Sequence, residues 1–114
     1  MAAPERLRTK AEFGLVKQTG QVFRGRFVLV SVLVNSPDHL RRFGFIVTRK
    51  TGNAVIRNRC RRRLKEIIRA NEAYMNDSVW TVVIARATLS SARYVDIEKD
   101  FISAYNAAME MRSR

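Results

Sequence analysis

Few side chains in this sequence could take part in covalent chemistry. It contains one histidine, His39, in a polar stretch, and one cysteine, Cys60, among apolar residues at helical spacing. The spacing indicates that Cys60 is a core thiol rather than a nucleophile. Asp96, Glu98 and Asp100 alternate along a predicted helix, so they point in different directions and form a poor metal site. No Cys and His spacing fits zinc, so the sequence predicts no catalytic residue and no metal site.

Positive charge is the strongest chemical feature, and it is concentrated. The 114 residues carry 22 Lys and Arg against 10 Asp and Glu, a net charge of +12. Residues 49–69 hold nine basic residues and one acidic residue, which is two thirds of that net charge. Such a density repels itself unless a polyanion offsets it, which indicates a nucleic acid or an anionic membrane surface as partner. Seven of the nine are arginines, whose forked guanidinium suits phosphate and bases.

A helix is predicted to follow Thr51-Gly52-Asn53 and to end near Ala70. Its apolar residues form one stripe, made of Ile56, Cys60, Leu64 and Ile67. The other sides carry Arg57, Asn58, Arg59, Arg61, Arg62, Arg63, Lys65 and Arg69. Like charges four residues apart destabilise a helix, so a face needed only for solubility would alternate signs. The stripe lacks Trp and Phe and is needed by the core, which favours nucleic acid over a membrane as the partner.

The elements that must position this helix follow from hydrophobic patterning. Thr9 and Glu12 have the spacing of a capping box, which predicts a helix from Lys10 to just before Gly20. Residues 27–34, 42–48 and 79–85 are predicted strands, and about six residues between the first two suggest an antiparallel pair. Ser90-Ser91 could cap a last helix. The order α-β-β-α-β-α describes an α/β (α+β) sandwich over residues 1–114, a single domain with a small mixed sheet of three to four strands.

Compartment and membrane association can also be predicted. The longest apolar run, residues 27–35, is too short to cross a bilayer, and residues 1–8 show no secretory signal. A single cysteine has no disulfide partner within the chain and fits a reducing cytoplasm. We therefore expect a cytoplasmic protein that does not span a membrane.

Residues 48–66 contain a specific motif: a basic pair, then Gly-Asn-Ala-Val, then Arg-Asn-Arg, then a basic run. In this register the segment resembles the signature of the protein subunit of bacterial ribonuclease P. Residues 7–13, 26–30 and 83–86 resemble the first helix, the first strand and the last strand of that family. The resemblance therefore covers nearly the whole chain.

The resemblance implies a fold, partners and sites. The fold is ribosomal-protein-S5-domain-2-like, with a left-handed β-α-β crossover that general topology rules disfavour. The partners are the catalytic RNA of ribonuclease P and precursor tRNA, whose 5′ leader is removed by Mg²⁺ held mainly by the RNA and the substrate. The implied RNA-binding residues are Arg49, Lys50, Asn53, Arg57, Asn58, Arg59, Arg61, Arg62, Arg63 and Lys65. A cleft between the first helix and the sheet receives the leader and is assigned to Phe13, Val16, Lys17, Val28, Val30 and Arg86.

This sequence departs from the family at two cleft positions. Lys17 and Val30 stand where the family usually or often has an aromatic residue, so we expect weaker base stacking and a more electrostatic cleft. Phe13, Val28 and Val30 could equally be plain core residues. A non-catalytic RNA-binding protein, such as a ribosome-associated or nucleoid module, would carry the same charge. Only the extended motif separates that alternative from a subunit of an endoribonuclease whose RNA is the catalyst.

Overall fold

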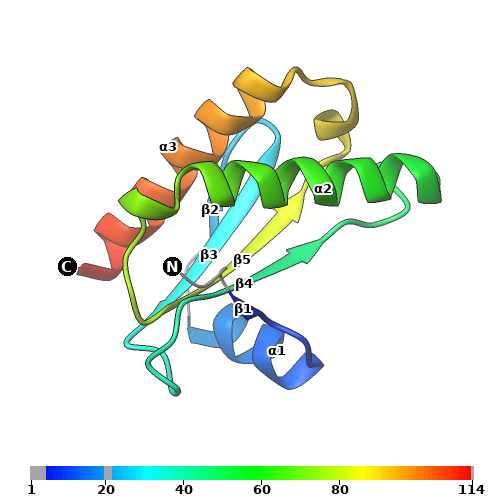
Figure 1. The fold of residues 1–114 in the computed structure, drawn as a ribbon. Helices are drawn as coiled ribbons and strands as arrows, with labels where there is room; N and C mark the ends of the chain where they lie inside the picture. Colours follow the sequence, from blue (N-terminus) through cyan, green and yellow to red (C-terminus); the bar gives the residue numbers. More distant parts are fainter. Residues whose placement is uncertain (1–4, 20–21, 114) are drawn as a thin grey trace.

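The computed structural model describes residues 5–19 and 22–113, which form one mixed sheet with helices on both of its faces (Figure 1). The strands are β1 (Glu5–Arg6), β2 (Val22–Arg24), β3 (Val28–Val34), β4 (Arg42–Ile46) and β5 (Val79–Ala85). The α-helices are α1 (Lys10–Thr19), α2 (Ala54–Ala70) and α3 (Tyr94–Ser113). Two short 3₁₀ helices, η1 (Glu72–Tyr74) and η2 (Ala87–Ser91), lie on either side of β5 in the sequence.

The last strand in the sequence lies at the centre of the sheet, whose order is β1-β4-β5-β3-β2. β5 runs antiparallel to β3, from Val28↔Ala85 to Val34↔Val79, and parallel to β4. The prediction that β3 and β4 pair with each other is therefore wrong. The two strands do run in opposite directions, but their connection is long enough to span the width of β5.

The sheet has five strands rather than the predicted three to four. The two additional strands are at the edges: β1 pairs with β4 over two residues, and β2 pairs with β3 over three. Segments this short show no hydrophobic alternation, so patterning could not reveal them.

The crossover from β4 through α2 to β5 is left-handed. In Figure 1, α2 lies in front of the sheet, and β5 lies to the left of β4 when both strands are turned to point upward. Most β-α-β connections have the opposite hand. The fold thus has the handedness that the family resemblance implied.

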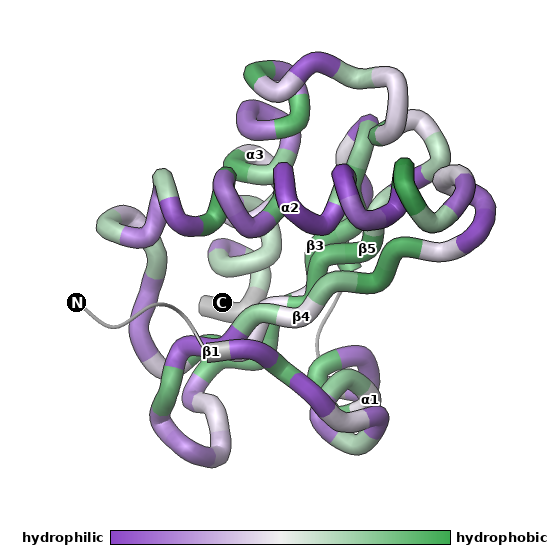
Figure 2. Tube along the Cα trace, turned by 45° about the vertical axis from the view of Figure 1, so that its right-hand side comes forward, coloured by the Kyte–Doolittle hydropathy of each residue, from purple (hydrophilic) through white to green (hydrophobic). Residues whose placement is uncertain are grey.

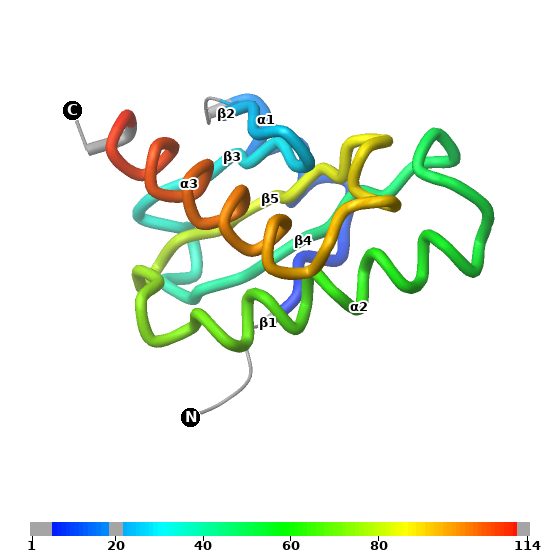
Figure 3. Tube along the Cα trace, turned by 90° about the horizontal axis from the view of Figure 1, so that it is seen from above, coloured from blue at the N-terminus to red at the C-terminus, as the bar shows by residue number. Residues whose placement is uncertain are grey.

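The two faces of the sheet are covered unequally. Figure 3 shows the strands between α2 and α1, and residues of α3 share one buried core with those of α2. On the α2 and α3 side, the core includes Val28, Val30, Val32, Phe43, Val83, Leu64, Ile67, Ile97 and Phe101. Figure 2 shows the apolar central strands beneath the largely hydrophilic α2. On the α1 side, a smaller buried cluster contains Leu7, Val16, Trp80 and Val82.

The helix boundaries follow local chemistry. The capping box of α1 is confirmed, because the Thr9 amide donates to Glu12 Oε1 at 2.9 Å and the Glu12 amide donates to Thr9 Oγ1 at 3.1 Å. Hydrogen bonds from the Arg8 and Thr9 amides lower the pKa of Glu12. α3 begins at Tyr94, later than predicted, because the hydroxyls of Ser90 and Ser91 donate to carbonyls within η2 instead of capping α3.

Candidate nucleic-acid interface

The start of α2 is fixed by a tight turn and a side-chain cap. The Asn53 side-chain oxygen accepts a hydrogen bond from the Ile56 amide at 3.0 Å, as expected of a helix cap. Gly52 has a φ of +153°, and a Cβ at this position would lie 2.8 Å from a side-chain atom of Ile56. Glycine at position 52 therefore allows the tight turn that leads from Arg49 and Lys50 to the start of α2.

The predicted division of α2 into an apolar stripe and a cationic face is confirmed. Cys60, Leu64 and Ile67 of the predicted stripe are buried against the sheet together with Ile68, whereas Ile56 is half-buried and packs against the edge of the core. Asn58, Arg59, Arg62, Lys65 and Arg69 are exposed, and Arg57, Arg61 and Arg63 are half-buried. Burial raises the pKa of the Cys60 thiol, although Arg59, Arg63 and Arg61 lower it, so Cys60 stays protonated at neutral pH.

The cations of α2 have few partners within the protein. In the part of the chain that the structure describes, no ion pair joins an α2 cation to a carboxylate. Instead, Arg61 donates to the Asn58 side chain, and Arg59 and Arg63 donate to the backbone carbonyls of Ser90 and Ala92. A face of arginines without carboxylates is suited to bind phosphate groups. We use the name cationic face of α2 for these seven cations together with Asn58: Arg57, Asn58, Arg59, Arg61, Arg62, Arg63, Lys65 and Arg69.

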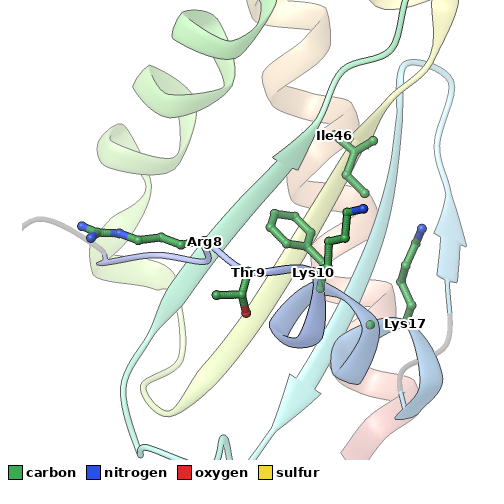
Figure 4. A pocket seen from close by; sticks show the side chains of 7 residues that line it. Arg8, Thr9, Lys10, Lys17 and Ile46 are labelled. Atoms are coloured by element: carbon green, nitrogen blue, oxygen red, sulfur yellow. The ribbon is translucent and has the colours of Figure 1, made fainter.

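A second candidate surface lies on the α1 side of the sheet. One hollow of about 420 Å³ is lined by Arg8, Thr9, Lys10, Phe13, Gly14, Lys17 and Ile46. In Figure 4, Lys10 and Lys17 rise from α1 on the same side as Ile46, whereas Arg8 extends away from them. The hollow therefore combines an apolar floor with two lysines at its margin.

A second hollow of about 770 Å³ lies at the carboxyl ends of β4 and β5, and it is lined by Leu29, Thr48, Arg49, Lys50, Ile84, Ala85, Arg86 and Ala87. The register pairs Ile46 with Ile84 and Leu29 with Ile84, so one half-buried row of three apolar side chains runs beneath both hollows. We call this row with its flanking cations the α1-side groove. It extends from α1 to the residues that precede α2.

The structure places only some of the predicted cleft residues in this groove. Phe13, Lys17 and Arg86 line it, and Arg86 is oriented by a 2.8 Å hydrogen bond from its Nη1 to the Gly25 carbonyl. Val28 and Val30 do not line it, because both are 0% exposed and point to the opposite face, into the core beneath α3. Val16 is also fully buried, in the cluster between α1 and the sheet.

Leu29, Ile46 and Ile84 were missed by sequence reasoning, as were Arg8 and Lys10. Side chains alternate along a strand, so Leu29 must point away from Val28 and Val30. That signal was present in the sequence, but it did not say which set faced α1. In the structure, the Ser31 hydroxyl donates to the Val16 carbonyl of α1 at 3.5 Å. Ser31 therefore faces α1, and so does Leu29, two residues earlier on the same strand.

The described residues contain neither a cluster of metal ligands nor a membrane-spanning helix. Among residues 5–19 and 22–113, no group of three His, Cys, Asp or Glu side chains could hold a metal ion. Within the same residues, no helix is both long and apolar enough to cross a bilayer. A cationic helix beside an apolar groove edged with Lys and Arg defines a nucleic-acid-binding protein of the α+β class.

Comparison with known proteins identifies the family. Residues 1–109 match the family model described as Ribonuclease P. The chain is 36% identical over 103 residues to the ribonuclease P protein component of Syntrophomonas wolfei, covering 90% of this chain and 86% of the relative. It is 38% identical over 117 residues to that of Brucella melitensis, covering 95% and 82%. The solved RNase P protein from Thermotoga maritima superposes with a TM-score of 0.78 at 27% identity, covering 89% of this chain and 94% of that one.

The chain therefore belongs to the ribonuclease P protein family, as its motif predicted. This membership makes it a protein component of a ribonucleoprotein of tRNA processing, with an RNA subunit as its partner. None of these relatives is a ribosome-associated or nucleoid protein, so nothing favours that alternative.

Proposed function

We propose that this protein binds the catalytic RNA of ribonuclease P through the cationic face of α2 and the 5′ leader of precursor tRNA through the α1-side groove. In this proposal the RNA carries out the Mg²⁺-dependent cleavage that makes the mature 5′ end, in the cytoplasm. The protein holds two polyanions together and screens their repulsion. The observation that carries the proposal is the placement of two distinct cationic surfaces: the groove, which includes Arg49 and Lys50, and the helix that begins four residues after Lys50.

The α1-side groove has the chemistry that a single strand requires. A half-buried apolar row can contact sugars and bases, and Phe13 adds one aromatic ring for stacking. Six cations, Arg8, Lys10, Lys17, Arg49, Lys50 and Arg86, line the two hollows and could contact phosphates. With one aromatic against six cations, we expect leader binding to depend strongly on salt and weakly on leader sequence.

Magnesium does not fit this protein as a resident ion. Mg²⁺ prefers carboxylate and phosphate oxygens, whereas the side chains that line the groove and form the cationic face are cationic, apolar, amide or hydroxyl, with no carboxylate among them. We therefore assign the metal to RNA phosphates. The protein would affect it indirectly, by lowering the repulsion that Mg²⁺ otherwise has to offset.

The decisive experiment is cleavage of a precursor tRNA by the cognate catalytic RNA at low Mg²⁺, with and without the protein. The protein should raise the cleavage rate under this condition. A rate that the protein leaves unchanged would contradict a role in ribonuclease P.

The groove can be tested separately with Lys17→Ala. The control is Lys99→Ala, which removes the same single charge from an exposed position of α3. In the assembled complex, Lys17→Ala should lower affinity for precursor tRNA more than affinity for mature tRNA, which has no leader. Lys99→Ala should affect both tRNAs equally. Equal losses from Lys17→Ala would remove this residue from the path of the leader.

A further inference from the structure

The segment that joins β5 to α3 is held from one side by two arginines of α2. Arg59 Nη2 donates to the Ser90 carbonyl at 3.1 Å, and Arg63 Nη1 donates to the Ala92 carbonyl at 3.1 Å. Residues four apart lie on the same flank of a helix, so the two guanidinium groups reach this segment side by side. Neither interaction is visible in the sequence, which shows Arg59 and Arg63 only as members of a basic run.

The same segment is held from its other side by the turn between β2 and β3. The Arg86 amide donates to the Phe27 carbonyl at 2.9 Å, and Thr88 Oγ1 donates to the Arg26 carbonyl at 2.8 Å. The turn itself is fixed by Asp100 of α3, whose carboxylate accepts the amides of Arg26 and Phe27, each at 2.8 Å. A Cβ on Gly25 would collide with this carboxylate.

Arg86 connects this segment to the α1-side groove. It is the first residue after β5, its carbonyl accepts the Leu89 amide of η2, and its side chain lines the second hollow. Leu89 is fully buried and anchors the middle of η2 in the core. At the end nearest α3, the Ala92 amide donates to the Leu89 carbonyl, and Arg59 and Arg63 add the hydrogen bonds to the Ser90 and Ala92 carbonyls.

We propose that Arg59 and Arg63 are positioning residues for the α1-side groove: by holding residues 87–92 against α2, they fix Arg86 where the leader would pass. This inference rests on the proposed function. A guanidinium has five N–H donors, so each arginine keeps donors free for a phosphate of the catalytic RNA. The catalytic RNA would thus contact the two arginines that hold one end of residues 86–92, and the leader would contact Arg86 at the other end.

The structural part of the proposal can be tested in the free protein. The variant Arg59→Gln with Arg63→Gln should speed amide hydrogen exchange at Leu89 and Ala92, whose amides are hydrogen-bonded within the segment. The matched control is Arg62→Gln with Lys65→Gln, which removes the same charge from exposed positions of α2. Equal exchange rates in the two variants would overturn the proposal, because the segment would then not depend on Arg59 and Arg63.

The functional part is tested in the holoenzyme, at protein concentrations that saturate the catalytic RNA. We expect Arg59→Gln with Arg63→Gln to lower the ratio of precursor to mature tRNA affinity by roughly three- to ten-fold, the size expected from losing one ordinary hydrogen bond. The control pair should lower this ratio less. If Lys17→Ala lowers the ratio but the Arg59 and Arg63 variant matches its control, the positioning role is wrong and the groove stands. If neither Lys17→Ala nor the Arg59 and Arg63 variant lowers the ratio, both the groove and the positioning role are wrong.

Discussion

The two faces of the sheet are formed by the same strands, but helices cover one face completely and the other only in part. Toward α2 and α3, the side chains of β3, β4 and β5 are almost all buried, and two helices close the face. Toward α1, one ten-residue helix covers only the end that holds Trp80 and Val82, and leaves Leu29, Ile46 and Ile84 half-buried. The first face supplies stability, and the second keeps apolar surface available to a ligand.

The unequal cover of the two faces indicates where a small protein can place a binding surface. A sheet face that is fully covered cannot bind a ligand, and a face with no cover would expose a large apolar patch. The partial cover by α1 is a compromise, in which the helix also contributes Phe13, Lys10 and Lys17 to the groove. We therefore expect substitutions on the two faces to separate stability from binding.

The largest expected effect is on the closed face. Phe101 of α3 is fully buried, and Phe101→Ala should lower the free energy of unfolding by about 3–5 kcal/mol, because it leaves a cavity in the core. Urea denaturation followed by circular dichroism would measure this change. A loss well below 1 kcal/mol would mean that this face is not the main core.

Gly44 should give the next largest effect, since the Phe13 ring of α1 packs directly against it. A Cβ at this position would lie 2.5 Å from ring atoms of Phe13. Gly44→Ala should therefore displace the ring, cost about 1–3 kcal/mol of stability and weaken leader binding. Urea denaturation and precursor tRNA binding would measure the two effects.

The cause can be isolated by combining Gly44→Ala with Phe13→Leu, which removes the colliding ring atoms. The double variant should regain most of the stability lost by Gly44→Ala. Its preference for precursor tRNA should stay at the level of Phe13→Leu alone. Additive losses of stability would show that Gly44 acts independently of Phe13.

On the face that α1 covers only in part, a substitution of Ile84 should affect binding more than stability. Because its side chain is half-buried, Ile84→Ala should cost only about 1 kcal/mol of stability, less than a fully buried residue of this size. It should also reduce affinity for precursor tRNA, since Ile84 lies in the middle of the apolar row. A loss of stability as large as that of Phe101→Ala would contradict the partial cover of this face.

The smallest effect concerns the covered end of the α1 side, where Asp38 holds Trp80. Burial raises the pKa of Asp38, but hydrogen bonds from Arg42, the Leu40 amide and Trp80 outweigh it and bring the pKa to about 2. The ordinary value is 3.8, so the carboxylate contributes stability above about pH 4 and loses it as the pH falls towards 2. Urea midpoints measured across this range should fall more steeply for the wild type than for Asp38→Asn. Parallel curves would contradict the role of Asp38.

Much of the fold was predictable because its long elements have strong periods. The α1 capping box and the apolar stripe of α2 both lie where the sequence indicates. Strand pairing was not predictable, because hydrophobic runs such as residues 28–34 and 79–85 are suited to several neighbours. The insertion of β5 between β3 and β4 depends on the whole sheet rather than on any local signal.

The two candidate surfaces differ in the same way. The cationic face of α2 is local in sequence, so composition and helical spacing were enough to find it. The α1-side groove is assembled from α1, three strands and the segment after β5, so it required the register of the strands. One residue of register decides whether Val28 and Val30 or Leu29 line the groove, and only the packing of α1 settles that choice.

The central position of β5 also bears on how the chain assembles. β3 and β4 are separated by a strand that is made last, so neither can complete its hydrogen bonding before residues 79–85 leave the ribosome. Until then, two strand edges stay unpaired while the nine cations of residues 49–69 are already synthesised. Non-local pairing of this kind forms late and slowly. During synthesis, the chain therefore gains its attraction to RNA before it gains its fold.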